Sequence, residues 1–386
     1  MSVLYTNAQV HTGYAVLKNH CVLIEKGVIQ GVFEEKPSEF EGITVDLKGR
    51  NLSSAFIDLH INGGAQFYFT KDVTEQTLLD IAESSHALGT HYTLPCLITS
   101  PLANILRGLE VMRNFKENNP QSGVIGMHLE GPFLHPKRRG AHLTEYLQQP
   151  TDAVLDALIN EGKDLISIFT IAPELFTDAQ LDRLLASGIN VAVGHSDATY
   201  AQATNAFERG VRLCTHLFNA MSPLQHRAPG VVGAVLDNEN VYAPIILDGF
   251  HCDYAAARIA YKIKQDKLFL ISDALFVGQK VTQFEWGAFD ATLVDGEYRN
   301  KEGNLAGAAI CMADAVRNAV KEVGISLEEA VKMATIRPAK AIGLDHRIGQ
   351  IAKGFPAHLV AFEEDLNNFE ILNTHYVGET LKVSPT

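Results

Sequence analysis

The chain has 386 residues, of which 46% are hydrophobic and 20% are charged. This length allows one large domain or two domains of ordinary size, with a substantial core. The 32 basic and 45 acidic residues give a formal net charge of −13. Because no long basic run accompanies this acidic balance, we expect no nucleic-acid partner. No segment approaches the roughly 20 apolar residues that span a bilayer, and we expect neither a membrane partner nor a secretory signal.

The five cysteines are an odd number and form no CxxC pair. This scattered pattern is typical of a reducing compartment, where thiols behave mostly as small core residues. We therefore expect a cytoplasmic protein. The 15 histidines are more informative, because histidine is the commonest metal ligand and a frequent proton carrier.

Both ends of the chain are rich in short β-type segments. These segments lie at 21–24, 28–32, 358–362 and 375–377. Neither end is long enough to bury a core alone. We therefore expect residues 1–54 and 348–386 to form one small β-sandwich domain beside the domain of residues 55–347.

Between the two ends, short apolar segments alternate with helical patterns. The segments predict buried parallel strands at 55–63, 91–100, 123–134, 166–174, 190–198, 212–221, 242–251 and 268–275. The helical patterns lie at 74–87, 102–115, 152–159, 178–185, 255–263, 311–323, 326–335 and 338–342. Eight strands in this alternation predict an α/β protein with a (β/α)8 TIM barrel. An open doubly wound sheet also alternates, but no GxGxxG motif follows an early strand.

The chemistry of such barrels lies at the carboxyl ends of the strands. Six of the predicted strands end in polar groups, namely Asp58, His60 and Asn62; His128 and Glu130; His195 and Ser196; Thr215, His216 and Asn219; Asp248 and His251; and Ser272 and Asp273. A single histidine at a strand end is usually structural. Six such groups at one rim are difficult to explain by packing alone.

Two imidazoles and one carboxylate with an open position form a known catalytic zinc pattern. Glu130, His195 and His216 fit this pattern, and the same ligands suit iron, cobalt, nickel or manganese. The alternative is that the two histidines only form hydrogen bonds. Asp273, at the end of the eighth strand, is the natural general base for a water activated there. Its alternative is a structural cap on the following loop.

Several further residues have two interpretations. Arg227 follows a polar loop and, with His251, suits an anion such as phosphate, although a solvated loop explains it equally. His142 could polarise a substrate carbonyl or lie at the surface. His128 shares a strand face with Glu130, and we expect a supporting role for it.

These segments together resemble the N-acetylglucosamine-6-phosphate deacetylase family of the amidohydrolase superfamily. The resemblance rests on Phe-Ile-Asp at 56–58, His-Leu-Glu-Gly-Pro at 128–132, Gly-His-Ser at 194–196, Thr-His-Leu-Phe-Asn-Ala-Met at 215–221, Asp-Gly at 248–249 and Ser-Asp-Ala at 272–274. It extends in order from about residue 50 to residue 345. The segments at 128–132 and 215–221 are specific to this branch.

The resemblance implies a metal-dependent barrel, a flanking β-sandwich and a homodimer. It implies release of acetate from N-acetylglucosamine 6-phosphate in amino-sugar catabolism and recycling, with Asp273 and His142 as catalytic residues. It implies the substrate-binding residues His142, Asn219, Ala220, Arg227, Asp248, His251, Leu305, Ala306 and Gly307. Arg227 would act across the dimer interface.

The end of the first barrel strand departs from the family pattern. Many amidohydrolases have His-x-His there and bind two metals, and some deacetylases have Gln-x-Asn and bind one. This chain has His60 and Asn62 instead, and its predicted fourth strand has no lysine that could bridge two metals. We therefore expect one tightly bound divalent ion, zinc in the first place, with His60 as the candidate ligand of a second, weaker site.

Three alternatives remain for the function. A deacetylase of N-acetylgalactosamine 6-phosphate is the nearest, since the two sugars are separated poorly by sequence. A cyclic-amide hydrolase is disfavoured by the missing lysine and the single first-strand histidine. A non-catalytic sugar-phosphate-binding barrel would usually have lost metal ligands or Asp273, which this chain keeps.

Overall fold

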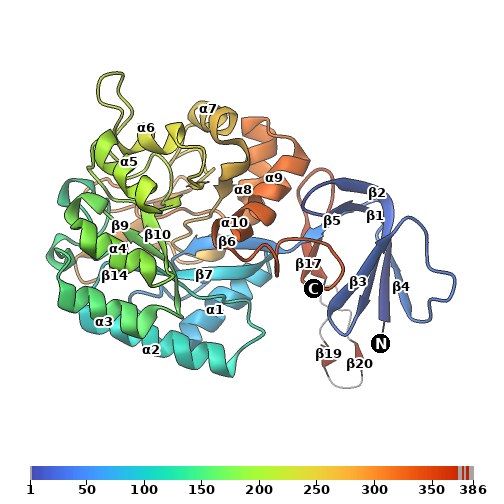
Figure 1. Ribbon diagram of the computed structural model, residues 1–386. Helices are drawn as coiled ribbons and strands as arrows, with labels where there is room; N and C mark the ends of the chain where they lie inside the picture. Colours follow the sequence, from blue (N-terminus) through green and yellow to red (C-terminus); the bar gives the residue numbers. More distant parts are fainter. Residues whose placement is uncertain (1, 373–375, 378–379, 382–386) are drawn as a thin grey trace.

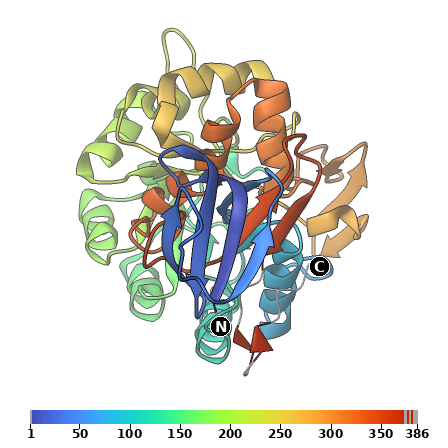
Figure 2. The same cartoon turned by 90° about the vertical axis from the view of Figure 1, so that its right-hand side faces the viewer.

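The computed structural model describes residues 2–372, 376–377 and 380–381. It contains a barrel with helices on its outside and a β-sheet that lies beside one end of the barrel (Figure 1). Figure 2, in which this sheet faces the viewer, shows the barrel helices around it. No helix in the described part of the chain is long and apolar enough to cross a membrane.

All eight predicted barrel strands are present. They are β6 (Phe56–Ile61), β7 (Thr90–Ile98), β8 (Met127–Glu130), β9 (Ile166–Ile171), β10 (Asn190–Val193), β11 (Leu213–Cys214), β12 (Ala243–Ile245) and β13 (Leu268–Leu270). The first six form a parallel sheet in sequence order, and β12 pairs with β13. Parallel bridges from Leu213 to Tyr242 and from Ile61 to Ala274 close the circle. The predicted TIM barrel is therefore confirmed.

The barrel strands are buried because apolar residues cover both of their faces. Inward-facing residues such as Leu59, Leu94 and Phe269 fill the interior. Their neighbours, such as Phe56 and Leu97, pack against the outer helices instead. This alternation follows from the period of two along a strand. Because the strands are parallel, their polar carboxyl ends lie at one rim of the barrel.

The helices that surround the barrel are α1 (Glu75–His86), α2 (Leu102–Asn118), α3 (Asp152–Gly162), α4 (Asp178–Ala186), α5 (Tyr200–Arg209), α6 (Gly230–Asp237), α7 (Tyr254–Lys264), α8 (Met312–Asn318), α9 (Leu327–Ala334) and α10 (Ile336–Ala341). Helices α5 and α6 were not expected. A capping box between Thr199 and Gln202 begins α5. Helix α6 contains Gly233, where a Cβ would lie 2.3 Å from the Cβ of Pro229, so close packing there needs a glycine despite its poor helix propensity.

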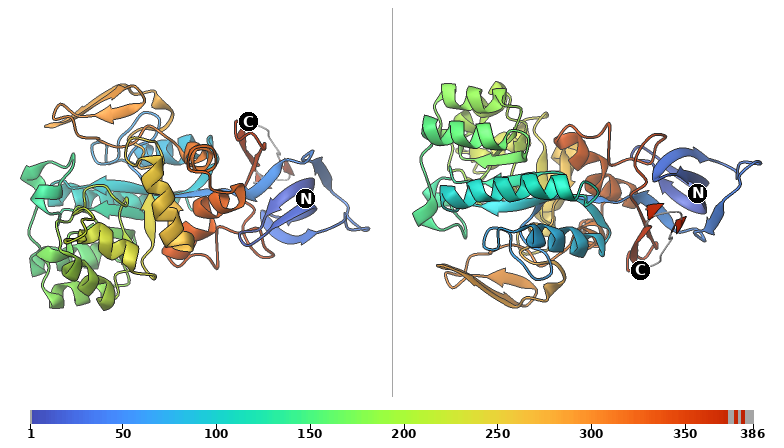
Figure 3. Two further views of the ribbon diagram at one scale, coloured as in Figure 1. Left: turned by 90° about the horizontal axis from the view of Figure 1, so that it is seen from above. Right: turned by 90° about the horizontal axis from the view of Figure 1, so that it is seen from below.

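A three-stranded antiparallel sheet also lies outside the prediction. It comprises β14 (Gln283–Trp286), β15 (Phe289–Val294) and β16 (Glu297–Arg299), inserted between β13 and α8. Figure 3 shows it on the outside of the barrel. Phe284 and Phe289 pack against Tyr68 with ring centroids 4.9 and 5.8 Å apart. The insertion therefore covers part of the rim.

The two chain ends share one sheet, which confirms the terminal β domain. Its strands are β1 (Ser2–His11), β2 (Val16–Glu25), β3 (Val28–Phe33), β4 (Ile43–Asp46), β5 (Asn51–Ser54), β17 (Leu359–Phe362) and β18 (Phe369–Leu372). The order is β18-β17-β5-β1-β2-β3, and β4 pairs with β1. Because Val360 pairs with Ser53, we propose the division of the chain into residues 1–54 with 348–386 and residues 55–347.

The last predicted strand lies partly beyond the described chain. His375 is outside the described residues, whereas Tyr376–Val377 form β19 and pair with β20 (Thr380–Leu381). This hairpin forms a separate two-stranded sheet.

Candidate active site

The three predicted metal ligands converge at the rim of the barrel. Glu130 Oε1 lies 3.0 Å from His195 Nε2 and 3.1 Å from His216 Nε2, and these two nitrogens are 3.1 Å apart. All three side chains are buried. Their donor atoms form a group of metal-binding geometry. Bonds of about 2.0–2.2 Å in a tetrahedron put donors about 3.3–3.5 Å apart, so small side-chain shifts would seat an ion.

The hydrogen bonds of His195 indicate that a cation belongs between these groups. His195 Nδ1 lies 2.8 Å from the carbonyl oxygen of Arg138, which can only accept. A neutral imidazole has one N–H, so Nδ1 carries it and Nε2 presents a lone pair to the Glu130 carboxylate. Burial, followed by the proximity of His142, lowers the pKa of His195 to about 4. Two acceptors that face each other at 3.0 Å fit a shared metal ion.

The backbone is unusual where the strands turn into the rim. His195, His216 and Asp273 have φ values of 48°, 25° and 48°, in a region that non-glycine residues seldom adopt. Such conformations concentrate at functional sites because they aim side chains in directions that regular strands do not. Here these conformations direct two metal-ligand candidates, His195 and His216, and the candidate base Asp273 toward the rim.

Four imidazoles, those of His60, His142, His195 and His216, surround the Glu130 carboxylate. Its burial would raise its pKa, but the neighbouring imidazoles of His60 and His195 hold that pKa well below its usual range. His60 Nε2 and His142 Nε2 each lie 3.5 Å from its second oxygen, Oε2. Cys96 Sγ lies 3.7 Å from the same oxygen. This contact distinguishes Cys96 from a thiol that only fills the core.

Asp273 is fixed by a residue to which the sequence analysis gave no role. The side-chain amide of Asn62 donates to Asp273 Oδ1 over 2.7 Å. The backbone N–H of Asp273 donates to the carbonyl of His60 over 2.9 Å. Its carboxylate lies 3.3 Å from His60 Nε2. The sequence signals for Asn62 were its place at the end of the first strand and its match to the Asn of the Gln-x-Asn pattern.

A cavity of about 120 Å³ opens over this centre. The candidate residues that line it are Glu130, His142, His195, Asn219, Ala220, His251, Asp273, Leu305, Ala306 and Gly307. Asn62 and Phe289 line it as well. Two of the three metal donors, the candidate base and most of the expected substrate contacts therefore line one space, and His216 lies directly behind Glu130 and His195.

His251 is held by Asp248, which does not itself appear among the lining residues. His251 Nδ1 lies 2.6 Å from Asp248 Oδ2, and Asp248 Oδ1 accepts the backbone N–H groups of Phe250 and His251. Burial would lower the pKa of His251, but this hydrogen bond and the charge of Asp248 raise it. The pair therefore favours the protonated form of His251 at the edge of the cavity.

Arg227 lies apart from the other candidates. It is exposed in the loop before α6, where Gln225 and Ala228 form a bridge, and this loop projects from the rim (Figure 1). Arg227 lines a separate surface cavity of about 570 Å³. Within one chain, it therefore does not join the residues around Glu130.

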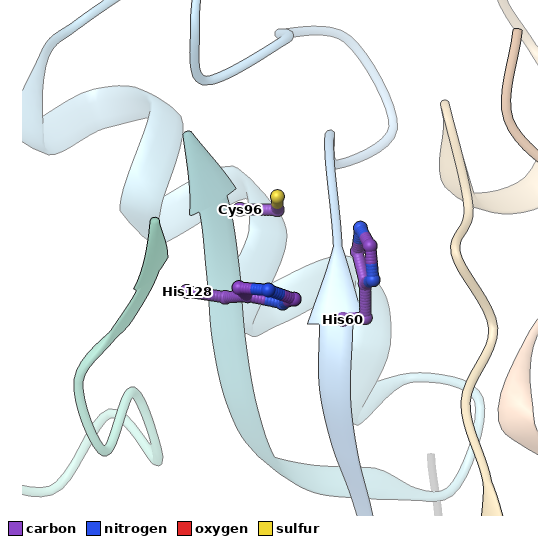
Figure 4. A group of neighbouring side chains, drawn as sticks. All are labelled: His60, Cys96 and His128. Atoms are coloured by element: carbon purple, nitrogen blue, oxygen red, sulfur yellow. The ribbon is translucent and has the colours of Figure 1, made fainter. Parts of the chain in front are cut away.

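His128 has the position of a supporting residue. Its Nε2 lies 2.7 Å from Thr170 Oγ1, which in turn lies 2.6 Å from Thr215 Oγ1. Burial, and then the neighbouring His60, lower its pKa well below the usual value. Its ring lies edge-on to that of His60, with centroids 4.4 Å apart (Figure 4).

Known proteins are similar to this chain in sequence. The amidohydrolase family matches residues 52–383, and the NagA composite domain matches residues 4–52. An N-acetylglucosamine-6-phosphate deacetylase from Haemophilus influenzae is 37% identical over 98% of this chain and 99% of its own. An N-acetylgalactosamine-6-phosphate deacetylase from a Shewanella species is 35% identical over 95% of this chain and 92% of its own.

Solved structures of deacetylases are also similar to this chain. The crystal structure of N-acetylglucosamine-6-phosphate deacetylase from Pasteurella multocida matches with a TM-score of 0.90 and 36% identity, over 96% of this chain and 97% of the other. An Asp-to-Ala variant from Mycobacterium smegmatis, in complex with N-acetyl-D-glucosamine-6-phosphate, matches with a TM-score of 0.88, 28% identity and the same coverage. By its barrel, its rim residues and these matches, the chain belongs to the amidohydrolase family.

Proposed function

We propose that this protein is a metal-dependent deacetylase that converts N-acetyl-D-glucosamine 6-phosphate to D-glucosamine 6-phosphate and acetate. Its place would be in amino-sugar catabolism and recycling. The observation that carries the proposal is the convergence of Asp273 and the Glu130 metal-donor group on one cavity. Relatives with this named activity cover nearly the whole chain.

Glu130, His195 and His216 would hold the ion. Their buried N/N/O donor set suits zinc first, and also iron, cobalt, nickel or manganese. When bound, a divalent ion supplies Lewis-acid activation of water and of the acetyl oxygen. His60 is the candidate ligand of a second, weaker site.

Asp273 would move the proton. Its carboxylate, oriented by Asn62, accepts a proton from the attacking water as the water oxygen bonds to the acetyl carbon. Asp273 then returns this proton to the nitrogen as the C–N bond breaks, which releases the amine and acetate. His142, held by Thr99 over 2.9 Å, lines the same space and would stabilise the negative charge that develops on the acetyl oxygen.

The phosphate and the sugar would be bound at the edge of the cavity. His251, Asn219 and the backbone at Ala220 would contact the phosphate and sugar, with Asp248 holding His251. The segment 305–307 would pass close to the sugar. Binding energy from these remote contacts would orient the acetamide toward Asp273.

Arg227 would complete the phosphate site from a second copy of the chain. Its exposed loop lies away from the cavity of its own chain, which supports a homodimer in which the arginine crosses the interface. We place the protein in the cytoplasm, on the support of its five unpaired cysteines.

Acetate release tests the proposal. Metal-replete protein would be assayed with N-acetylglucosamine 6-phosphate, the unphosphorylated sugar and N-acetylgalactosamine 6-phosphate. We expect rapid release from the first compound and slow release from the other two. Equal rates with and without phosphate would contradict the phosphate site, and faster release from the galactosamine epimer would contradict the substrate. Release from none would contradict the enzymatic function.

A further inference from the structure

The two carboxylate oxygens of Glu130 face different sets of donors. Oε1 lies against His195 and His216, as described above. Oε2 lies 3.5 Å from His60 Nε2 and 3.7 Å from Cys96 Sγ. His60 and Cys96 come from the neighbouring strands β6 and β7 (Figure 4). Glu130 therefore stands between two groups of metal-ligating side chains, with one oxygen toward each.

The distances around Oε2 match the edges of a coordination tetrahedron. Metal–nitrogen and metal–oxygen bonds of about 2.1 Å put N and O about 3.4 Å apart, and a metal–sulfur bond of about 2.3 Å puts S and O about 3.6 Å apart. The observed separations are 3.5 and 3.7 Å. Asp273 Oδ1, 3.3 Å from His60 Nε2, lies at the distance expected for a fourth donor. These three separations are therefore compatible with a shared ion.

The His60 ring makes no well-aligned hydrogen bond to the described residues, although its Nε2 lies 3.5 Å from Glu130 Oε2 and 3.3 Å from Asp273 Oδ1. Among the residues that the structure describes, none makes a hydrogen bond of acceptable geometry to either ring nitrogen of His60, which is 2% exposed. Buried polar atoms are rarely left unpaired in native proteins. One donor atom each from His60, Cys96 and His128 lies within 4.8 Å of the others. The imidazole of His60 and the thiol of Cys96 thus lie together beside two carboxylates, in a cluster of potential metal donors.

We propose that His60, Cys96 and Glu130 Oε2 bind a second divalent transition-metal ion, with the Cys96 thiolate as a ligand. The proposal rests on the proposed function, because both ions share Glu130. A sulfur–nitrogen–oxygen donor set selects zinc or cobalt over magnesium or calcium. On binding, the thiol releases its proton to solvent. Two cations that share a carboxylate repel each other, so the second binds more weakly than the first.

Cobalt(II) titration of the metal-free protein tests the site. A thiolate bound to cobalt gives a sulfur-to-metal charge-transfer band in the near ultraviolet, which imidazole and carboxylate ligands do not give. We expect two cobalt ions per chain at saturation, with the band appearing during the second equivalent. Saturation without the charge-transfer band, with either one or two cobalt ions bound per chain, would overturn the proposal.

Two variants separate Cys96 from the other thiols. Cys96→Ser should bind one cobalt ion and lack the band. Cys21→Ser, which changes a buried thiol in β2 of the terminal sheet, should bind two ions and keep the band. A band that persists in Cys96→Ser would assign it to another cysteine and overturn the proposal. Deacetylation with one bound ion would leave the proposed function intact, whereas no bound cobalt and no acetate release would contradict both.

Discussion

The side-chain amide of Asn62 donates a 2.7 Å hydrogen bond to Asp273 Oδ1 and so joins the ends of the first and last barrel strands. The same two strand ends are joined by the backbone N–H of Asn62 and the carbonyl of Ala274, 2.9 Å apart. Barrel closure thereby fixes the direction of the candidate base. A carboxylate aimed by the scaffold needs less reorganisation during proton transfer.

Asp273→Asn should nearly abolish acetate release. The amide has the shape of the carboxylate but cannot accept the water proton, and loss of general acid–base catalysis costs roughly 10²–10⁴ in rate. The ion held by Glu130, His195 and His216 should remain, so kcat and metal content are measured together. Wild-type kcat in this variant would exclude Asp273 as the base.

Asn62→Ala tests the positioning of Asp273. Loss of a hydrogen bond to a charged group costs about 1.5–3 kcal/mol, which corresponds to roughly 10–150-fold. We expect kcat to fall within this range while KM changes little, because Asn62 acts through Asp273. A rise in KM at unchanged kcat would instead place Asn62 in substrate binding.

The barrel and its rim were predictable because the signals repeat along the chain. Glu130 ends a buried strand, and His195, His216 and Asp273 each follow one. Parallel strands in a barrel bring such ends together. Cys96 was not recognised because its place beside Glu130 depends on strand register, which pairs Cys96 with His128 and Ile98 with Glu130. A one-residue slip would turn the thiol to the other face.

Other misses have local causes. The inserted sheet contains the turn Asp295-Gly296, both with positive φ, a hairpin signal that was available in the sequence. Helix α6 was not predicted because glycine is a poor helix former, although Gly233 fits there because a Cβ would lie 2.3 Å from the Cβ of Pro229 in the preceding turn. Arg227 lies away from the cavity because of the way its loop folds. The spacing of residues along the sequence gives no sign of this separation.

Arg227→Ala should raise KM for the phosphorylated sugar by roughly 10–150-fold, the cost of about 1.5–3 kcal/mol for a charge-assisted contact. Activity toward the unphosphorylated sugar should not change. Arg107→Ala, which removes an exposed arginine paired with Glu110 on α2, is the matched control. Equal losses with both sugars would argue against a phosphate contact.

Subunit mixing tests whether Arg227 acts across an interface. A heterodimer of Arg227→Ala and Asp273→Asn chains has one complete site, because the first chain supplies Asp273 and the second supplies Arg227. We expect mixing after mild dissociation to restore acetate release at a phosphorylated-sugar concentration near the wild-type KM, where each variant alone is much slower than the wild type. If Arg227 served its own chain, both sites of the heterodimer would be defective and mixing would not raise the rate at this concentration.

The His251–Asp248 pair should make phosphate binding dependent on pH. Burial opposes the charged form of His251, but Asp248 raises its pKa above the usual value of 6.5, with smaller contributions from Asp273 and Glu297. The imidazolium is therefore present below this raised pKa and is lost as the pH rises through it. KM for the phosphorylated sugar should increase over that interval, while KM for the unphosphorylated sugar should not follow it.

Asp248→Asn provides the matched variant for this pH dependence. Asparagine can still accept the backbone N–H groups of Phe250 and His251 through its carbonyl oxygen, but it no longer carries the charge that favours the imidazolium. Burial then dominates and lowers the pKa of His251. We expect the rise in KM to begin at a lower pH than in the wild type. Superimposable KM–pH profiles for the two proteins would show that the charge of His251 does not hold the phosphate.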